Sequence, residues 1–362
     1  MSENIIITVN FLRNTKKILI MAVCVVCLTM ALISSILMPK TQISVKSILK
    51  NIKNESNIAQ NETSTTLNPI EVLPLKKQSH GAVVIEQSSR RVLYDDGMNE
   101  RCYPASTTKV LTALCVLDNM PLDKLITIPK EAEGVEGSSI YLKAGQKISV
   151  RDLLYGLMLR SGNDAAVTLA IATSGNIQNF TALMNETARK CGALNSNFVN
   201  PHGLHDEMHY TTAYDLALIC AKAYENADFC KIVSTSKAKI TVDDEARYIG
   251  NKNKLLHLYD GANGVKTGFT KKSGRCLVSG AKREGMQVIG VVLNHSDMWN
   301  DTIRMLDFVF DNYYMCPLDN AMLTRGENVV KVKVKQNVTE NWRDLGYPIK
   351  KDGSERLVVE SC

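Results

Sequence analysis

The stretch "YPASTTKVLTALCVL", residues 103–117, places three hydroxyl side chains and a lysine in front of an almost wholly apolar run. Such a run predicts a buried helix that begins near Ser106. A serine at that place is usually an N-cap, which accepts a hydrogen bond from a free backbone N–H. The alternative is chemical, because Ser106 and Lys109 share one face of a helix and the amine can take the proton of the hydroxyl. The rest of the chain decides between these two interpretations.

The composition of the chain bounds the classes of protein to consider. With 362 residues there is room for one large or two moderate domains and a sizeable core. The net charge of +6 is mild, and the Lys and Arg residues are scattered rather than gathered in a stripe, which argues against a nucleic-acid partner. The ten cysteines show no regular framework, so no disulfide is predicted, and Cys115 and Cys220 are expected in the core.

The N-terminal part of the chain is not expected to belong to the fold. Residues 18–38 form an uncharged apolar stretch about as long as a membrane span, and Arg13, Lys16 and Lys17 precede it. The stretch is long for a signal peptide and lacks an A-x-A cleavage site, so it predicts an uncleaved anchor behind a cytoplasmic segment, residues 1–17. Cleavage would instead release a secreted protein. Residues 39–77 are polar and predict a flexible stalk.

The remaining chain predicts an α+β fold. Short strands are expected at 82–86 and 91–94, a helix from about 106, and a helix-rich region from about 150 to 224. Strands return in "GVKTGFT", "RCLVSGAK" and "QVIGVVLN", and "TIRMLDFVFDNYYM", residues 302–315, predicts a closing amphipathic helix. This order implies an antiparallel sheet assembled from both ends of a domain at 78–316, flanked by helices and with the helical region inserted. Residues 317–362, with the alternating "NVVKVKVKQNV", predict a short β-rich C-terminal region.

Three short motifs are candidates for chemistry, although each is weak alone. S-x-x-K occurs at Ser47, Ser106, Ser234, Ser236 and Ser279, S-x-N at Ser161 and Ser174, and K-[ST]-G at Lys266 and Lys272. Only Ser106 follows a strand pair and opens a long helix. Ser161–Asn163 falls between two helices and Lys266–Gly268 falls in a strand, whereas the second copies lie in ordinary turns. The three chosen motifs can therefore meet at one cleft.

This set of motifs, in this order, is that of the penicillin-interacting serine enzymes. The segments "RCYPASTTKVLTAL", "GSSIYLKAGQKISVRDLLYGLMLRSGNDAAVTLA", "NPHGLH" and "DGANGVKTGFTKKSGRCLVSGAKREGMQVIGVVLN" carry the likeness further. From about residue 80 to 315 the chain resembles the D-alanyl-D-alanine carboxypeptidases of the low-molecular-mass penicillin-binding protein group, serine peptidase family S11. The resemblance implies a β-lactamase/transpeptidase-like fold, no cofactor and no metal, and a location on the outer face of a bacterial cell membrane.

The resemblance also implies a role for each motif residue. Ser106 would attack the carbonyl between two terminal D-alanines of a peptidoglycan stem peptide, giving an acyl-enzyme that water hydrolyses. Lys109 would be the base, kept neutral by burial and by the charge of Lys266. Ser161 would relay a proton to the departing D-alanine. β-Lactam antibiotics would acylate the same serine.

Substrate binding is assigned in the same way. Asn163 would bind the substrate backbone, and the K-T-G strand, Lys266, Thr267 and Gly268, would hold the terminal carboxylate through a charge and a hydroxyl donor. The backbone N–H groups of Ser106 and Phe269 would form the oxyanion hole.

Three other interpretations compete with this one. "HGLHDEMH" brings His202, His205 and His209 together, but its order is not the H-E-x-x-H of a zinc enzyme and its residues do not form a helical apolar pattern. A β-lactamase shares the three motifs, yet no E-x-x-L-N-like segment lies between Asn163 and Lys266 to activate a deacylating water. A non-catalytic cell-wall-binding protein on the same scaffold is expected to have lost Ser106, Lys109 or Lys266, and all three are present.

Overall fold

The computed structural model describes residues 80–334 and 345–361, which belong to one compact unit. The predicted segments at 1–17, 18–38 and 39–77 lie outside the described residues. In the part of the chain that the structure describes, every helix is too short or too polar to cross a membrane.

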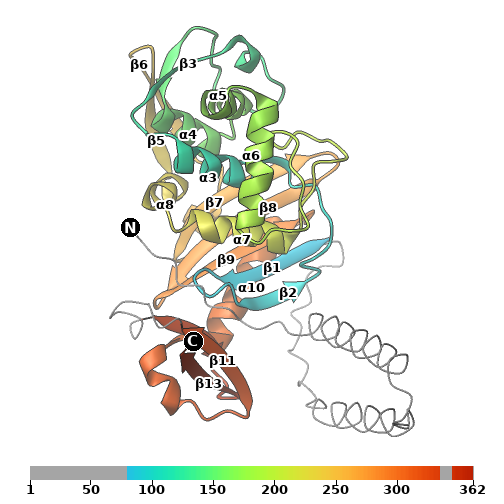
Figure 1. The fold of residues 1–362 in the computed structure, drawn as a ribbon, viewed down its shortest axis with the longest axis vertical. Helices are drawn as coiled ribbons and strands as arrows, with labels where there is room; N and C mark the ends of the chain where they lie inside the picture. The colour runs from blue at the N-terminus through green and yellow to red at the C-terminus, as the bar shows by residue number, and fades with distance from the viewer. Residues whose placement is uncertain (1–79, 335–344, 362) are drawn as a thin grey trace, which may run out of the picture. The chain divides into compact units, whose positions relative to one another are not determined.

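A five-stranded antiparallel sheet forms the centre of the fold (Figure 1). Its strand order is β2-β1-β9-β8-β7, with β1 at Gly81–Glu86, β2 at Val92–Asp96, β7 at Ala262–Thr270, β8 at Gly274–Arg283 and β9 at Met286–Leu293. Strand β1 pairs with β9 from Gly81↔Leu293 to Glu86↔Val288. The predicted α+β sheet built from both ends of the domain is confirmed.

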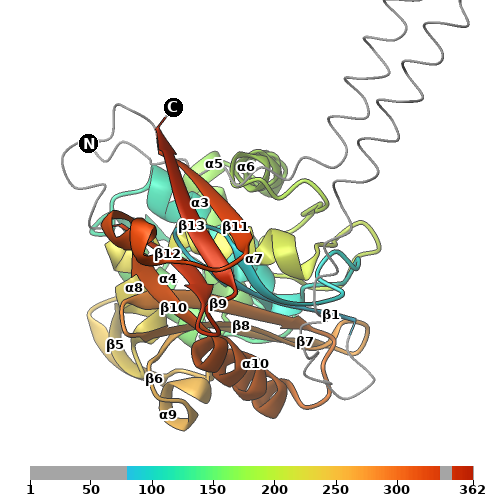
Figure 2. The ribbon, with the colours of Figure 1, turned by 90° about the horizontal axis from the view of Figure 1, so that it is seen from below.

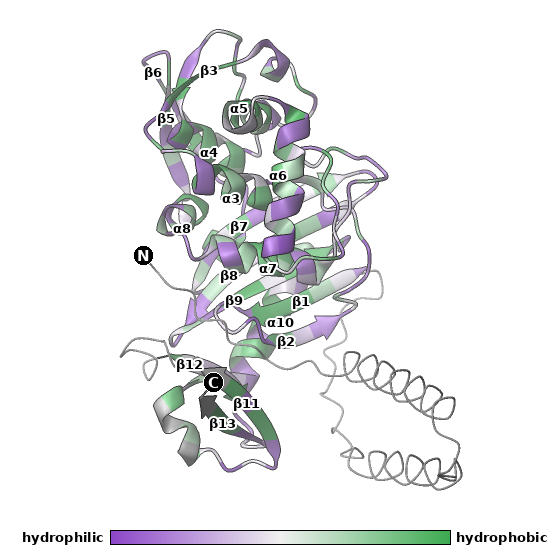
Figure 3. Cartoon of the chain, viewed as in Figure 1, coloured by the Kyte–Doolittle hydropathy of each residue, from purple (hydrophilic) through white to green (hydrophobic). Residues whose placement is uncertain are grey.

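Both faces of this sheet are covered, which explains the continuous apolar runs in its strands. Along β1, Val83 and Ile85 pack with the helical region, whereas Ala82 and Val84 pack with α10, Met298–Asn312, on the opposite face. In Figure 2 helix α10 lies against the sheet on the side away from α3. Helix α6, Ile177–Lys190, differs from these covered strands, because its side visible in Figure 3 carries hydrophilic residues.

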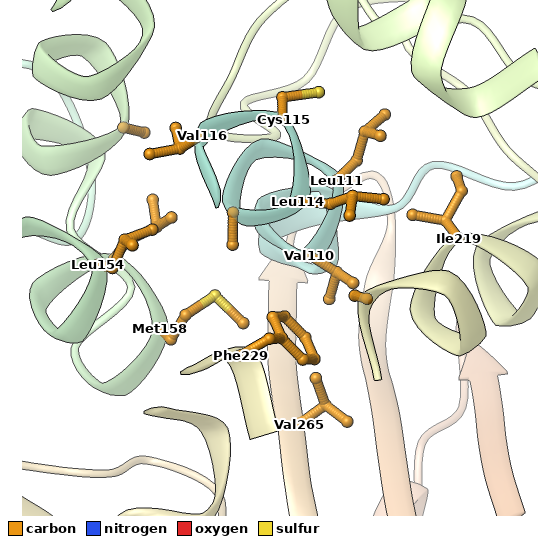
Figure 4. Close-up of a cluster of buried hydrophobic side chains, with 14 of the residues drawn as sticks. Val110, Leu111, Leu114, Cys115, Val116, Leu154, Met158, Ile219, Phe229 and Val265 are labelled. Carbon is orange, nitrogen blue, oxygen red and sulfur yellow. The ribbon is translucent and has the colours of Figure 1, made fainter. Parts of the chain in front are cut away.

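The helical region lies between β2 and β7 in the chain. It contains α3 Lys109–Asn119, α4 Val150–Leu159, α5 Asn163–Ser174, α6, α7 Ala213–Ala223, α8 Ala227–Ser234 and the short α9 Leu255–Leu258. Serine, asparagine and threonine side chains cap four of these helices, as Ser149 does for α4 and Thr212 for α7. Helix α3 lies at the centre of this region, and Figure 4 shows its Val110, Leu111 and Leu114 among Ile219, Phe229 and Val265.

A second, four-stranded sheet was not predicted from the sequence. Its order is β3-β4-β5-β6, with β3 at Leu125–Thr127, β4 at Lys147–Ser149, β5 at Lys237–Val242 and β6 at Glu245–Gly250. Two of its strands are only three residues long, and β5 exposes three of its six residues. Such short and exposed strands give little periodic signal in a sequence.

The sequence predicted the closing helix too far toward the C-terminus. Helix α10 begins four residues before the predicted 302–315 and ends at Asn312, because Tyr313–Pro317 forms strand β10. Strand β10 pairs with β12, Gly346–Lys350, from Tyr313↔Lys350 to Pro317↔Gly346. Two adjacent tyrosines favour a strand, and the pairing partner more than thirty residues away decides the outcome.

The C-terminal region is rich in β-strands, as expected. After the 3₁₀ turn Leu318–Leu323, strand β11 at Asn328–Val334 runs parallel to β13 at Glu355–Ser361. These strands and β12 enclose a small core of their own, which includes Val332, Tyr347 and Leu357.

Candidate active site

Ser106 lies in a tight turn rather than in the helix that follows. Residues Ala105–Thr108 form a 3₁₀ turn, and α3 begins at Lys109. Neither element has a side-chain N-cap. The hydroxyl of Thr107 donates to Pro104 O at 2.6 Å and that of Thr108 to Ala105 O at 2.8 Å. Two of the three hydroxyls therefore hold the turn together, and the third, on Ser106, is left for Lys109.

The amine of Lys109 lies against Ser106 inside the protein. Its Nζ is 3.1 Å from Ser106 Oγ, 2.8 Å from Asn163 Oδ1 and 2.6 Å from the backbone oxygen of His202. The side chain of Lys109 has no solvent exposure. Burial is the largest cause that holds the pKa of Lys109 well below its ordinary value, and the charges of Lys266 and Lys252 lower it further.

The three contacts fit the three hydrogens of an ammonium, and they also fit the neutral amine that the lowered pKa of Lys109 favours. A neutral Nζ has two hydrogens and one lone pair, and it has three neighbours. Since Asn163 Oδ1 and the His202 carbonyl only accept, the two hydrogens go to them. The lone pair is then directed at Ser106 Oγ, where it can accept the hydroxyl proton. The arrangement is that of a nucleophile beside its base.

Ser161 and Asn163 form the junction between α4 and α5. Ser161 has a φ of 65°, a conformation that costs a residue with a side chain about 1 kcal/mol or more. Its Oγ is buried and has no hydrogen-bond partner among the described residues. The side chain of Asn163 is held at both ends, because Oδ1 accepts from Lys109 and one N–H of Nδ2 donates to Glu136 O at 2.5 Å. Its predicted contact with the substrate backbone stays a prediction.

Strand β7 approaches the nucleophile turn from the edge of the central sheet. A Cβ on Gly268 would lie 3.1 Å from the backbone nitrogen of Ser106, tighter than most real contacts, so glycine lets the strand come this close. Lys266 is 1% exposed, and its Nζ donates to Thr267 O at 2.9 Å. Burial, helped by the charge of Lys252, lowers the pKa of Lys266 to about 7.

An open cavity of about 360 Å³ lies at this meeting point. Its lining includes the motif residues Ser106, Ser161, Thr267, Gly268 and Phe269, and it further includes Ser138, Lys252, Lys254, Arg275, Met298 and Trp299. The three predicted motifs are thus brought together. The sequence did not predict the six further lining residues, because they lie in separate segments that meet only in the folded chain.

His209 supports the nucleophile turn. Its Nδ1 accepts the backbone N–H of Val199 at 3.1 Å, so its Nε2 carries the hydrogen and donates to Thr108 Oγ1 at 2.8 Å. Burial lowers the pKa of His209 to about 4, which keeps the ring neutral near pH 7. Thr108 in turn donates to Ala105 O, and Ala105 has a strained φ of 50°. His209, one of the three histidines that raised the question of a zinc site, is therefore a hydrogen-bond donor that holds the turn.

The described residues contain no cluster of three metal-binding side chains. Cys115 and Cys220 are free thiols and buried, as predicted.

Comparison with known proteins relates most of the region around the cavity to one family. Residues 63–297 match the peptidase S11 family of D-alanyl-D-alanine carboxypeptidases. The D-alanyl-D-alanine carboxypeptidase DacF of Bacillus subtilis is 34% identical over 271 residues, which are 72% of this chain and 69% of DacF. DacC of Escherichia coli K12 is 34% identical over 243 residues, 63% of this chain and 60% of DacC, so the chain spans about three fifths of that relative.

Solved structures agree in fold. The Streptomyces K15 DD-transpeptidase superposes with a TM-score of 0.61 at 33% identity, over 65% of this chain and 97% of that one. The D-alanyl-D-alanine carboxypeptidase DacD of Francisella tularensis gives a TM-score of 0.62 at 27% identity, over 71% and 74% of the two chains. The family match contains the motifs of Ser106, Ser161 and Lys266 and ends before the C-terminal strands.

Proposed function

Because the chain belongs to the D-alanyl-D-alanine carboxypeptidase family, peptidase S11, we propose that it removes the terminal D-alanine from peptidoglycan stem pentapeptides through an acyl-enzyme on Ser106. The observation that carries this proposal is the 3.1 Å contact between Ser106 Oγ and a fully buried Lys109 amine. A nucleophilic hydroxyl needs such a base, and burial favours the neutral form of the base.

The reaction then has two steps. Lys109 takes the proton of Ser106 as Oγ attacks the peptide carbonyl, and the backbone N–H groups of Ser106 and Phe269 stabilise the oxyanion. Ser161, which lines the cavity, passes a proton to the departing D-alanine amine. Water hydrolyses the acyl-enzyme in the second step.

We assign the terminal carboxylate of the substrate to the sheet side of the cavity. Thr267 and Arg275 line it there, and the buried Lys266 precedes Thr267 on β7. A guanidinium stays charged at every working pH and suits a carboxylate, so Arg275 joins the predicted carboxylate-binding residues.

The test uses the full-length chain in detergent and a pair of stem peptides that end in D-Ala-D-Ala, one with a free carboxylate and one with an amide. We expect D-alanine release from the acid, and a kcat/KM about thirty- to a thousandfold lower for the amide, which leaves the cationic site without its anion. Equal release from both peptides would contradict the carboxylate assignment. Penicillin turnover that far outpaces peptide cleavage would favour a β-lactamase, and retention of peptide without release would favour a binding protein.

A second activity is suggested by the K15 neighbour, which bears the name of a transpeptidase. The acyl-enzyme on Ser106 gives transpeptidation when an amine attacks it in place of water. Adding an amine acceptor to the same assay separates the two outcomes, because only transpeptidation yields a longer peptide.

We also infer that residues 18–38 anchor the enzyme in the membrane with residues 78–316 on the outer face. The support is the uncharged apolar stretch behind Arg13, Lys16 and Lys17. Cell fractionation and protease treatment of intact protoplasts test this inference. A protein found in the medium would show that the segment is cleaved.

A further inference from the structure

The segment between β9 and α10 connects two parts of the cavity lining. At its end, Met298 and Trp299 open α10 and line the cavity. At its start, the backbone N–H of His295 donates to Arg275 O at 2.9 Å. Arg275 also lines the cavity, and on its other side it pairs with Phe269 of β7. The backbone of Arg275 is therefore held between β7 and the residue that follows the turn after β9.

The side chain of His295 forms a buried pair with Asp301. The ring of His295 is 1% exposed and the carboxylate of Asp301 is 2% exposed. Nδ1 of the ring lies 3.1 Å from Asp301 Oδ2. A carboxylate only accepts hydrogen bonds, so Nδ1 carries the hydrogen. Nε2 has no hydrogen-bond partner among residues 80–334 and 345–361. The ring therefore acts through Nδ1 alone.

Asp301 is fixed on the helix side of the pair. It lies in the first turn of α10, where the helix dipole favours a negative charge. Its backbone N–H donates to Asp297 O at 3.0 Å, and its Oδ1 is bonded by Arg304 one turn further on. The bond to His295 thus closes the segment into a loop that contains Trp299. Neither member of the pair lines the cavity, so neither is expected to touch the substrate.

We propose that His295 and Asp301 are positioning residues for recognition of the terminal carboxylate of the substrate. Their hydrogen bond keeps the segment after β9 against β8, and it thereby holds the backbone of Arg275 and the start of α10 in place. This inference rests on the proposed function and on the assignment of the terminal carboxylate to the sheet side of the cavity.

The role of the pair is selective, because other elements position the reacting groups. Ser106 lies in the turn that Thr107 and Thr108 hold, and Lys109 is held by Asn163 and by the His202 carbonyl. Loss of the pair should therefore weaken binding of the carboxylate and leave the chemical step nearly unchanged.

The test uses the acid- and amide-terminated peptides with two variants of His295. For His295→Phe we expect KM for the acid to rise about tenfold, with kcat changed less than about threefold. The amide has no carboxylate to lose, so its kcat/KM should stay nearly constant and the preference for the acid should fall about tenfold. His295→Asn should keep the preference, because its side-chain nitrogen takes the place of Nδ1.

A double-variant cycle tests whether the two residues act as one unit. Asp301→Ala should reduce the preference as His295→Phe does, and the double variant should lose no more than either single variant. The matched control is Glu355→Gln, which alters a buried ion pair away from the cavity. It should lower the melting temperature and keep the preference.

The outcomes separate this inference from the proposed function. An unchanged preference in His295→Phe and Asp301→Ala overturns the inference alone, as does an equal loss of kcat for both peptides, which indicates a merely structural role. A loss in His295→Asn as large as in His295→Phe overturns the role of Nδ1. Equal release from acid and amide by the natural enzyme overturns the carboxylate assignment and the inference with it. No release from either peptide overturns the proposed function.

Discussion

Residues 80–312 and the C-terminal residues 313–334 and 345–361 are held together in different ways. The first region has a five-stranded sheet with a core on each face, and it supplies every residue that lines the catalytic cavity. The second region has two sheets of two strands each, β10-β12 and β11-β13, around a small core. Because every residue that lines the cavity lies in the first region, substitutions in the second region should change the stability of the protein and leave its catalytic activity unchanged.

A buried ion pair joins the two regions. Arg91, beside β2, donates to Glu355 Oε2 at 3.0 Å and also contacts the backbone oxygen of Pro348. Its guanidinium lies over the rings of Tyr313 and Tyr347 at 5.5 and 5.6 Å from their centroids. Both side chains of the ion pair are largely buried. Such a pair is costly to break from one side, because the remaining charge loses its partner.

The largest effect is expected at the nucleophile. Ser106→Ala should abolish covalent labelling by fluorescent penicillin, because among the described residues only the Ser106 hydroxyl has a hydrogen bond with the Lys109 amine. Ser234→Ala and Ser279→Ala, which alter two other S-x-x-K matches, should be labelled normally. Mass spectrometry that places the adduct on another serine would remove Ser106 from the mechanism.

The next effect is expected at the base. Lys109→Arg keeps the positive charge but cannot become neutral, so acylation should fall at least about a hundredfold. Stopped-flow measurement of penicillin acylation checks this. A near-normal rate for the arginine variant would show that Lys109 is not the base.

The pH dependence should reveal both buried lysines. Activity needs neutral Lys109, so kcat/KM rises as this group loses its proton on the acid side. Lys266 must be protonated to attract a carboxylate, so kcat/KM falls about tenfold per unit as pH rises through its pKa of about 7. Lys266→Arg should remove the basic limb. A profile that stays flat to pH 9 in the natural enzyme would contradict this role of Lys266.

A smaller effect is expected for the support of the turn. His209→Phe leaves Thr108 Oγ1 without its donor and the N–H of Val199 without its acceptor, so kcat should fall about tenfold with little change in KM. His209→Gln, which retains polar atoms, should recover part of the loss. The control is His205→Asn in the same segment, whose exposed ring lies beside exposed Glu207 and half-buried Tyr103. A change in KM alone would argue against a positioning role.

The smallest effect on activity is expected at the ion pair between the regions. Glu355→Gln removes the charge opposite Arg91 and should lower the melting temperature by several degrees while changing kcat/KM less than about twofold. Arg91→Met serves as the second variant. A loss of activity comparable to that of His209→Phe, in protein that is still folded, would show that the C-terminal region influences the cavity.

The sequence predicted most where a pattern repeats along the chain. The strands of the central sheet have continuous apolar runs, and the motifs of Ser106, Ser161 and Lys266 follow fixed short spacings. Lys252, Arg275 and Trp299 have no such spacing, because they come from three separate segments and meet only through the packing of the sheet on the helical region. Strands β3 and β4 were missed since three residues show no period. The start of β10 was missed because its distant partner β12, rather than local propensity, ends the helix.

The pairing of β1 with β9 has a consequence for biosynthesis. Roughly two hundred residues separate the two strands, and at about 5–20 residues per second a ribosome needs some ten to forty seconds to add them. During that interval β1 has no partner on its β9 side, and for most of it the strand that carries Lys266 does not yet exist. A nascent chain therefore cannot react with a β-lactam until nearly the whole domain has been made. Truncation anywhere before Leu293 removes part of β9 and leaves the nucleophile turn on an incomplete sheet.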